Sequence, residues 1–433
     1  MSVVETKMEQ VINDDAAANS ACSCFIEPPV SLPTHNPESS ASTLGPDDIA
    51  VQPTQQFPYV VGFTATATRH QPPEPFGLGY DTGCPLSLPL NNQKSLSKAE
   101  YCLSRHLCPS RSLEDFKTLT ITAVIRTGHS RGAQLVVIDN DTVAKIYDPL
   151  YYNEVNEYGF EEDVMFDAFS DYSREAAAYN QLQESPAARQ VTPAFYGTWT
   201  ISVDTEIRDG GELQMRTRQV PLVLMEYVRG ETMRNIDARA LPEQMRSRIL
   251  KKAIDTDIII FHAGVDNEDF CPRNIMVVGL RPNPKDDTSD DVAIKAIDFN
   301  VATVRRHPKC YGADMVREID EERKAWLPKL QSPMIRWFNG IETFAWDDWC
   351  PRGDGKPELW LWEQYRDDER YIPVVWDPSK PRVRPEVVEL ESGSETSVDS
   401  GLGLDMEVEE GEEGGKKSSV EVEDHSVSAV QVS

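Results

Sequence analysis

The sequence predicts an α+β fold of two lobes: a small lobe with a five-stranded antiparallel sheet and one helix, and a larger, mainly helical lobe. Three observations lead to this prediction. Runs of β-branched and aliphatic residues typical of strands come first, among them QLVVID, TVAKIY and RQVPLVLMEYV. A helix-forming run, SREAAAYNQLQ, lies between them. A long stretch with apolar residues at helical spacing, PEQMRSRILKKAIDTDIIIFHAG, then opens the second half of the chain.

The two ends of the chain differ in composition from this central part. Residues 1–112 are rich in Pro, Ser, Thr, Asn and Gln, as in EPPVSLPTHNPESSAST and RHQPPEPFGLGY. Such segments bury too little apolar surface to offset their chain entropy. We therefore predict disordered tails at 1–112 and 385–433. The folded domain is expected at 113–384, with its small lobe at 113–227 and its large lobe at 228–384.

The elements of the small lobe follow from strand and turn residues. QLVVID and TVAKIY flank Asn140–Asp141 and are therefore expected to form a hairpin with a tight turn. VTPAFYGTWTISV and RQVPLVLMEYV are expected to be strands joined through the Gly-rich turn RDGGELQ. Residues 148–171, ahead of the helix at 173–183, hold eight acidic side chains and no basic one. We expect a solvated loop there; the alternative is a surface that attracts a basic substrate.

The large lobe is predicted to begin with a helix over residues 242–264. One face of this helix is apolar, with Ile249, Ile254, Ile258 and Phe261. Two strand-like runs, NIMVVGL and VAIKAIDF, follow and flank the polar loop RPNPKDDTSDD. Seven of the eight tryptophans fall between Trp326 and Trp376, and we expect them to form the core of this lobe.

The net charge limits the range of partners. The chain has a formal charge of −29, which disfavours binding to nucleic acid or to an anionic membrane surface. The first twenty residues lack the apolar core of a secretory signal, and no apolar run is long enough to cross a bilayer. We expect an intracellular protein, cytoplasmic or nuclear, whose tails are available to protein partners.

Several polar residues lie where phosphoryl transfer would need them. This reaction depends mostly on positioning and charge neutralisation, so it needs a cation, an acid that orients it, oxygen ligands for Mg²⁺ and a base. Lys145, in the strand VAKIY, can supply the cation, and Glu175, on the following helix, can pair with it. Taken alone, a strand lysine is usually a solvated edge residue and a helix glutamate is usually exposed.

The run GVDNEDFCPRNIMVV supplies two more candidates. Asp269 and Asn274 are five residues apart, and Pro272 restricts the loop between them. This spacing lets Asp269 address a hydroxyl group while Asn274 turns towards a metal. Asp266 is a competing acid that lacks this spacing. Asp298 ends the strand VAIKAIDF and can bind Mg²⁺, although Asp and Asn are also common in ordinary turns.

Five motifs, in this order, resemble the protein-kinase superfamily, in the atypical form of fungal-type protein kinase-like domains. VAK resembles the family's strand lysine motif, REAAAY the helix glutamate motif, and LVLMEYVRGETM the hinge between the lobes. FHAGVDNEDFCPRNIMV is similar to the catalytic loop, and IDFN is similar to the Asp-Phe-Gly magnesium motif. The likeness covers roughly residues 118–305.

This resemblance implies a phosphotransferase that uses ATP and Mg²⁺ to phosphorylate a hydroxyl acceptor, with protein Ser/Thr preferred. It implies catalytic roles for Lys145, Glu175 and Asp269. The implied magnesium ligands are Asn274 and Asp298, and the implied nucleotide contacts are Gly128, Gly132, Lys145, Glu226 and Val228.

The sequence also departs from the family. Asn267 and Glu268 replace a His and an Arg, so control by a phosphate on the activation loop is not expected. Cys271 replaces a lysine, Asn300 replaces the glycine of the magnesium motif, and the loop RTGHSRG holds two glycines in place of three. Two alternatives stay open: a pseudokinase that binds partners without turnover, and a small-molecule kinase of the same fold. In a third interpretation the tails bind partners and the globular part supports them.

Overall fold

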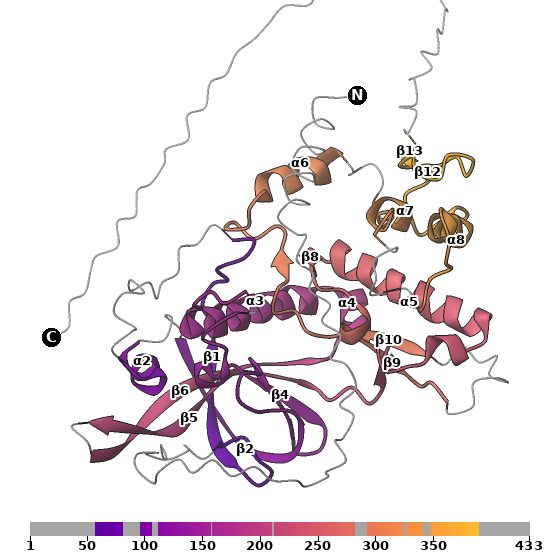
Figure 1. The fold of residues 1–433 in the computed structure, drawn as a ribbon. Coiled ribbons are helices and arrows are strands. Elements are labelled where there is room, and N and C mark those ends of the chain that lie inside the picture. Colours follow the sequence, from indigo (N-terminus) through magenta and orange to yellow (C-terminus); the bar gives the residue numbers. More distant parts are fainter. Residues whose placement is uncertain are drawn as a thin grey trace, which may run out of the picture. The chain divides into compact units, whose positions relative to one another are not determined.

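The computed structural model describes most of the central part of the chain (Figure 1). The described residues are 57–80, 96–105, 111–156, 158–209, 212–281, 292–322, 324, 327–340, 346 and 348–388. The described residues, which end at Val388, belong to one compact unit. The predicted tail from 389 onwards lies outside the described residues, and the division into lobes at 227 and 228 stays a prediction.

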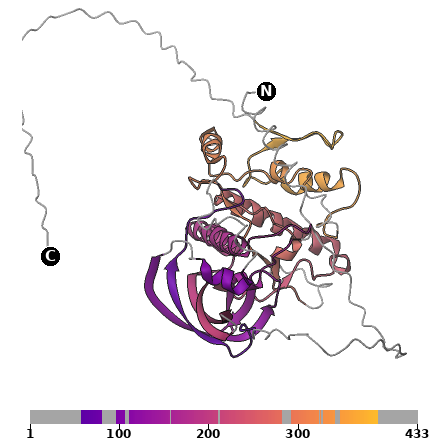
Figure 2. The same cartoon turned by 60° about the vertical axis from the view of Figure 1, so that its left-hand side comes forward.

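The first part of the fold is a closed antiparallel barrel in the strand order β1-β2-β3-β4-β6-β5, whose curvature is visible in Figure 2. Its strands are β1 (Thr64–Gln71), β2 (Arg111–Arg126), β3 (Gln134–Ile138), β4 (Thr142–Ile146), β5 (Phe195–Asp209) and β6 (Glu212–Glu226). The mixed α/β class is confirmed. The prediction of a five-stranded sheet is wrong, because β1 pairs with both β2 and β5 and adds a sixth strand that closes the barrel.

The prediction of disorder over residues 1–112 is wrong for the described part of that region. Residues 64–71 form β1, and a short helix, α2 (Lys98–Ser104), begins with a capping box at Ser97. Tyr59 is fully buried. The segment is polar in composition, but some of its apolar side chains are buried in the core through non-local contacts: Tyr59, Ala67, Phe76, Tyr101 and Cys102.

The predicted hairpin is confirmed, with its turn one residue earlier than expected. Strands β3 and β4 pair from Gln134↔Ile146 to Ile138↔Thr142. Asp139 and Asn140 both have positive φ, as a tight hairpin turn requires.

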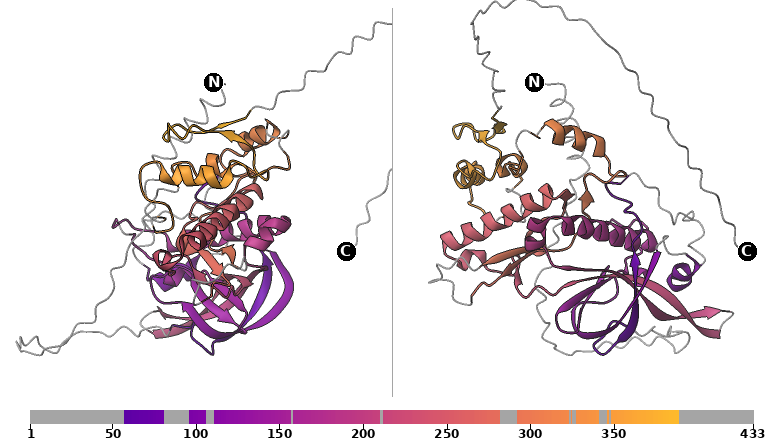
Figure 3. Two further views of the ribbon diagram at one scale, coloured as in Figure 1. Left: turned by 90° about the vertical axis from the view of Figure 1, so that its right-hand side faces the viewer. Right: turned by 180° about the vertical axis from the view of Figure 1, so that it is seen from behind.

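Helix α3 (Val164–Glu184) is longer than the sequence indicates. It begins inside the acidic segment because the Asp163 carboxylate caps it, accepting hydrogen bonds from the amides of Met165 and Phe166. The expectation of a solvated loop over 148–171 is therefore wrong for its last eight residues. Figure 3 shows α3 crossing the open end of the barrel.

The second part of the fold is mainly helical. The predicted long helix is confirmed as α5 (Glu243–His262), and the predicted hairpin as β9 (Ile275–Val278) with β10 (Ala293–Ala296). The remaining elements are α4 (Pro186–Val191), β7 (Glu231–Thr232), β8 (Val265–Asp266), β11 (Thr303–Val304), α6 (Ala313–Glu322), α7 (Pro333–Arg336), α8 (Lys356–Tyr365), β12 (Val374–Val375), β13 (Glu386–Val387) and the short 3₁₀ turns η2 (Pro149–Tyr151), η3 (Ala238–Ala240) and η4 (Pro272–Asn274). Of the described tryptophans in this part, most are buried, as predicted: Trp337, Trp346, Trp349, Trp360 and Trp376.

The predicted end of the domain at 384 is too early, because β13 pairs with β12 beyond it. Among the described residues, no helix combines the length and the apolar character that crossing a membrane requires.

The buried His70 gives the barrel a pH-dependent stability. Its ring nitrogens contact the hydroxyls of Tyr172 and Thr200, and burial lowers its pKa to about 4. Between about pH 6.5 and pH 4, His70 therefore binds a proton in the unfolded chain but not in the folded protein. The free energy of unfolding falls as the pH is lowered through this range, by roughly 3 kcal/mol at most. His70→Gln should flatten this dependence in urea denaturation compared at about pH 7 and about pH 4.5.

Asp167 makes a contribution of opposite sign. Burial, followed by neighbouring carboxylates, raises its pKa to about 7, so its stabilising effect is lost as the pH rises towards 7. Asp167 is present in both wild type and His70→Gln, so its contribution cancels when the pH dependences of their stabilities are compared. Equal pH slopes for the two proteins would show that His70 is not the group responsible.

Candidate active site

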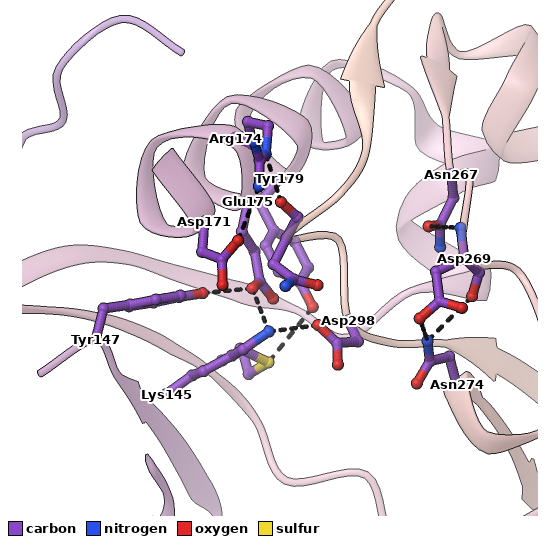
Figure 4. A network of polar contacts seen from close by, with 12 residues as sticks. Lys145, Tyr147, Asp171, Arg174, Glu175, Tyr179, Asn267, Asp269, Asn274 and Asp298 are labelled. Carbon is purple, nitrogen blue, oxygen red and sulfur yellow. Dashed lines mark hydrogen bonds and ion pairs between the residues drawn. The ribbon is translucent and has the colours of Figure 1, made fainter. Parts of the chain in front are cut away.

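Three of the predicted site residues meet at one point. Lys145 lies on β4 with its side chain 4% exposed, and its ammonium contacts both the Glu175 carboxylate of α3 and Asp298 Oδ1, the latter at 2.5 Å (Figure 4). These residues come from a barrel strand, a helix and the segment after β10. The sequence-based expectation that Lys145 is a solvated edge residue does not apply.

The charges in this cluster stabilise one another. Burial alone would lower the pKa of Lys145, but the carboxylates of Asp298 and Glu175 raise it above its ordinary value. Burial alone would raise the pKa of Asp298, but the Lys145 ammonium lowers it, with help from the guanidinium groups of Arg126 and Arg273. Lys145 and Asp298 are therefore both charged at neutral pH.

Tyr147 is a site residue that the sequence analysis missed. Its hydroxyl donates to the same Glu175 oxygen that Lys145 contacts, and Glu175 is fully buried. The other carboxylate oxygen, Oε1, is buried without a donor among the described residues. A signal was present, because residues two apart on a strand face the same side, and Tyr147 follows Lys145 by two.

The second cluster contains Asp269 and Asn274. Asn274 Nδ2 donates to Asp269 Oδ2 at 2.8 Å, and Arg273 forms an ion pair with Asp269 Oδ1 at 2.5 Å. The Asp269 amide donates to Asn267 Oδ1 at 3.2 Å. Pro272 opens the turn η4, which places Asn274 beside Asp269.

The β9–β10 hairpin brings the two clusters to the same end of one sheet. Ile275, which follows Asn274, pairs with Ala296, and the Ile297 amide donates to the Asn274 carbonyl at 2.9 Å. Asp298 is the next residue, and Figure 4 shows it between the two clusters. Its φ of +65° is rare for a residue with a side chain and is the kind of backbone strain that gathers at functional sites.

Asn274 and Asp298 suit a hard cation. The amide nitrogen of Asn274 is engaged by Asp269, so its oxygen points away from Asp269 (Figure 4). Neither Asn274 Oδ1 nor Asp298 Oδ2 accepts a hydrogen bond from a described residue, and the Asp298 side chain is 27% exposed. Within the described ranges no cluster of three His, Cys, Asp or Glu residues forms a closed metal cage. One carboxylate and one amide fit Mg²⁺, which keeps waters and phosphate oxygens as its other ligands.

The loop that holds Gly128 and Gly132 leads into β3, the strand that pairs with β4, and it uses its amides internally. The Gly128 amide donates to Gln134 Oε1 at 2.7 Å, and the amides of Arg131 and Gly132 both approach the Tyr151 carbonyl. Gly132 is close in sequence to Leu135, which pairs with Lys145 across the sheet. In this conformation these three amides are not available to a phosphate group.

Of the predicted hinge residues, Glu226 ends β6 and Val228 follows it. The Glu226 carboxylate accepts from Lys295 Nζ at 2.7 Å and from the Ala194 amide at 3.0 Å, so this side chain ties β6 to β10. The Val228 amide, by contrast, has no acceptor among the described residues. A backbone donor of this kind can bind an aromatic base.

Asn300, in place of the glycine of the magnesium motif, is anchored to α3. Its carbonyl accepts from Arg174 Nε at 2.6 Å. Arg174 also pairs with Asp171 at 2.8 Å. These contacts fix the segment after Asp298 to the helix that carries Glu175. Nothing in the sequence pattern connects Arg174 with Asn300, which lies far away along the chain.

The comparisons with known proteins give only a weak likeness. No family model matches the sequence, and no curated protein matches it. Among solved structures, a BubR1 kinase domain aligns at 10% identity and a TM-score of 0.28, covering 43% of this chain and 48% of that chain. Two structures of WbdD, one described as a bifunctional kinase-methyltransferase, align at 15% and 14% identity.

Both WbdD alignments have a TM-score of 0.29 and cover 60% of this chain, with 51% and 52% of the WbdD chains. The present chain thus spans about half the length of the solved chains that it matches. TM-scores below 0.5 are too low to assign a function, so the chemistry has to be inferred from the site residues themselves.

Proposed function

We propose that this chain is an ATP- and Mg²⁺-dependent phosphotransferase that transfers the γ-phosphate to a hydroxyl group. The observation that carries this proposal is the contact of Lys145 with both Glu175 and Asp298, beside the Asp269–Asn274 pair. A scaffold protein that catalyses no reaction has no physical need for all five of these side chains in this arrangement. A protein Ser/Thr acceptor is proposed on the sequence resemblance alone.

Each residue has a role that its contacts support. The Lys145 ammonium would bind the α and β phosphates, with Glu175 fixing its position. Asp298 and Asn274 would hold Mg²⁺, which neutralises phosphate charge when it is bound. Asp269 would accept the proton of the acceptor hydroxyl, and Arg273 and Asn274 hold its carboxylate in place.

Arg126 is a candidate for the phosphate contacts that the glycine loop does not offer. Arg126 pairs with Leu135 across β2 and β3, and Leu135 pairs with Lys145 across β3 and β4. Side chains directly opposite each other lie on the same face of a sheet, so Arg126 and Lys145 share a face. The Arg126 charge also helps to lower the pKa of Asp298, although burial acts in the opposite direction.

A scaffold without turnover is the second candidate. The engaged amides of Gly128 and Gly132 favour it, because a phosphate would have to displace their present partners. A small-molecule acceptor would leave the site residues and their roles unchanged. Transfer of labelled phosphate from ATP to mixtures of peptides and of small hydroxyl compounds distinguishes these cases.

ATP should raise the melting temperature of the protein, and more so with Mg²⁺. A concentration about tenfold above Kd stabilises by about 1.4 kcal/mol, which corresponds to a shift of roughly a few degrees for a domain of this size. A thermal-shift assay with and without Mg²⁺ measures this. Lys145→Met, compared with its own baseline, should show a much smaller shift. No shift in the wild-type protein would contradict nucleotide binding and favour the scaffold.

A further inference from the structure

The residues after β1 cross from the barrel to the segment that follows Asp298. We call residues 74–80 the strap; the sequence analysis placed them in a disordered tail. Figures 1 and 3 show the indigo chain beyond β1 beside the orange chain around β11. Phe76 and Tyr80, at either end of the sequence FGLGY, are 1% and 2% exposed, so the strap is part of the core.

The strap binds the segment 299–311 through several hydrogen bonds. The Tyr80 hydroxyl accepts from the Val304 amide at 2.7 Å, and the Tyr311 amide donates to the Gly79 carbonyl at 3.0 Å. Tyr80 also forms an antiparallel bridge with Cys310. These contacts hold the middle and the far end of the segment that begins directly after Asp298.

The strap also packs on α3. The ring of Phe76 lies edge-on to that of Phe166, with centroids 5.6 Å apart. A Cβ built on Gly77 would lie 2.9 Å from Arg174 Nη1 and 3.3 Å from Ser170 Cβ. Arg174 is the residue that donates to the Asn300 carbonyl. The strap therefore contacts both elements that hold the carboxylate partners of Lys145.

Glycine is required at the closest approach. Gly79 has a φ of +78°, and a Cβ built there would lie 2.1 Å from Thr303 Cγ2. Thr303 is 7% exposed and its β-branched side chain is stiff, so it cannot move aside cheaply. The fit between the strap and segment 299–311 depends on the absence of a side chain at this position.

We propose that the strap positions Asp298 and Glu175 for phosphate transfer, with Gly77, Gly79 and Tyr80 as positioning residues. The catalytic part of this inference rests on the proposed function, whereas the bracing of segment 299–311 stands on the contacts alone. The strap gives the site a fixed arrangement without a phosphate on that segment. This agrees with Glu268, whose negative charge near Tyr80 and Cys310 would repel such a phosphate.

Hydrogen exchange of the full chain tests the bracing directly. Gly79→Ala should raise the amide exchange rates of segment 299–311 by about tenfold or more, because displacing the strap lowers the free energy of local opening. Gly62→Ala is the matched control: Gly62 also has a positive φ, +91°, but nothing lies within 4 Å of the added Cβ. The control should leave exchange in 299–311 unchanged.

A second, milder variant keeps the test decisive if Gly79→Ala fails to fold. Tyr80→Phe removes only the hydroxyl that accepts from Val304, so it should raise exchange in the same segment by a smaller factor. Unchanged exchange in 299–311 for both Gly79→Ala and Tyr80→Phe would overturn the strap proposal.

The Mg²⁺ dependence of transfer tests the link to the site. A strap variant should need a several-fold higher Mg²⁺ concentration for half-maximal rate, because Asp298 is less well placed. A partly unfolded preparation lowers the rate but does not change the Mg²⁺ concentration for half-maximal rate. Gly62→Ala should also leave this Mg²⁺ concentration unchanged. An unchanged midpoint with raised exchange would refute the positioning role. If wild-type protein transfers no phosphate, the proposed function fails, while the exchange result still decides the bracing.

Discussion

Asp269→Asn should lower the rate of phosphate transfer by about 10²–10⁴-fold, the usual contribution of a positioned general base. The substitution keeps the size of the side chain and its contact with Asn274 while removing the proton acceptor. Nucleotide binding should persist, because Lys145 and Asp298 are untouched. A labelled-phosphate assay gives the rate, and the thermal shift with ATP and Mg²⁺ gives the binding.

Asp266 is the matched control, as the competing acid in the same stretch. Its carboxylate forms an ion pair with Arg336 of α7 at 2.9 Å, so the structure gives it a partner outside the Asp269–Asn274 cluster. Asp266→Asn should cost some stability and retain transfer. Loss of transfer in Asp266→Asn together with retention in Asp269→Asn would show that the base has been assigned to the wrong residue.

The site was predictable where residue type and local structure sufficed. Lys145 on a strand, Glu175 on the next helix and Asp298 at a strand end were each ambiguous alone, but their order along the chain was specific. The structure brings these three into contact. Asp269 and Asn274 were singled out by a short spacing and one proline, which are local properties; the hydrogen bond between them was not predicted.

The strand β1 and the strap were not predictable, because their order comes from distant partners. The sequence RHQPPEPFGLGY is polar and contains three prolines and two glycines, residues that usually mark loops. Its glycines are there for close packing against Thr303 and Arg174, which lie far away in sequence. Likewise, the glycines of the loop at 128–132 gave no hint that their amides are engaged by Gln134 and Tyr151.

Charge counting misled in the acidic segment. Asp148 contributes to its negative charge, yet this carboxylate is fully buried and pairs with Arg218 of β6 through two hydrogen bonds of 2.6 and 2.8 Å. The Tyr59 hydroxyl also donates to it, from the region predicted to be disordered. A net charge describes a solvated segment only when its charges have no buried partners.

This buried pair leads to the largest stability effect that we expect from one substitution. Arg218→Met should lower the free energy of unfolding by about 3–5 kcal/mol, because it leaves the Asp148 carboxylate buried without a countercharge. The Arg218 side chain is 5% exposed, and its Nε also donates to Thr205. Urea denaturation at neutral pH measures the change.

Arg239 provides the exposed counterpart to Arg218. It pairs with Asp348, but the two side chains are 63% and 55% exposed, so Arg239→Met should change stability by at most about 1 kcal/mol. A similar small loss for Arg218→Met would mean that water or another donor reaches Asp148. A large loss for Arg218→Met alone would indicate that this buried charge pair helps to hold Tyr59, β4 and β6 together, since Asp148 lies two residues beyond the end of β4.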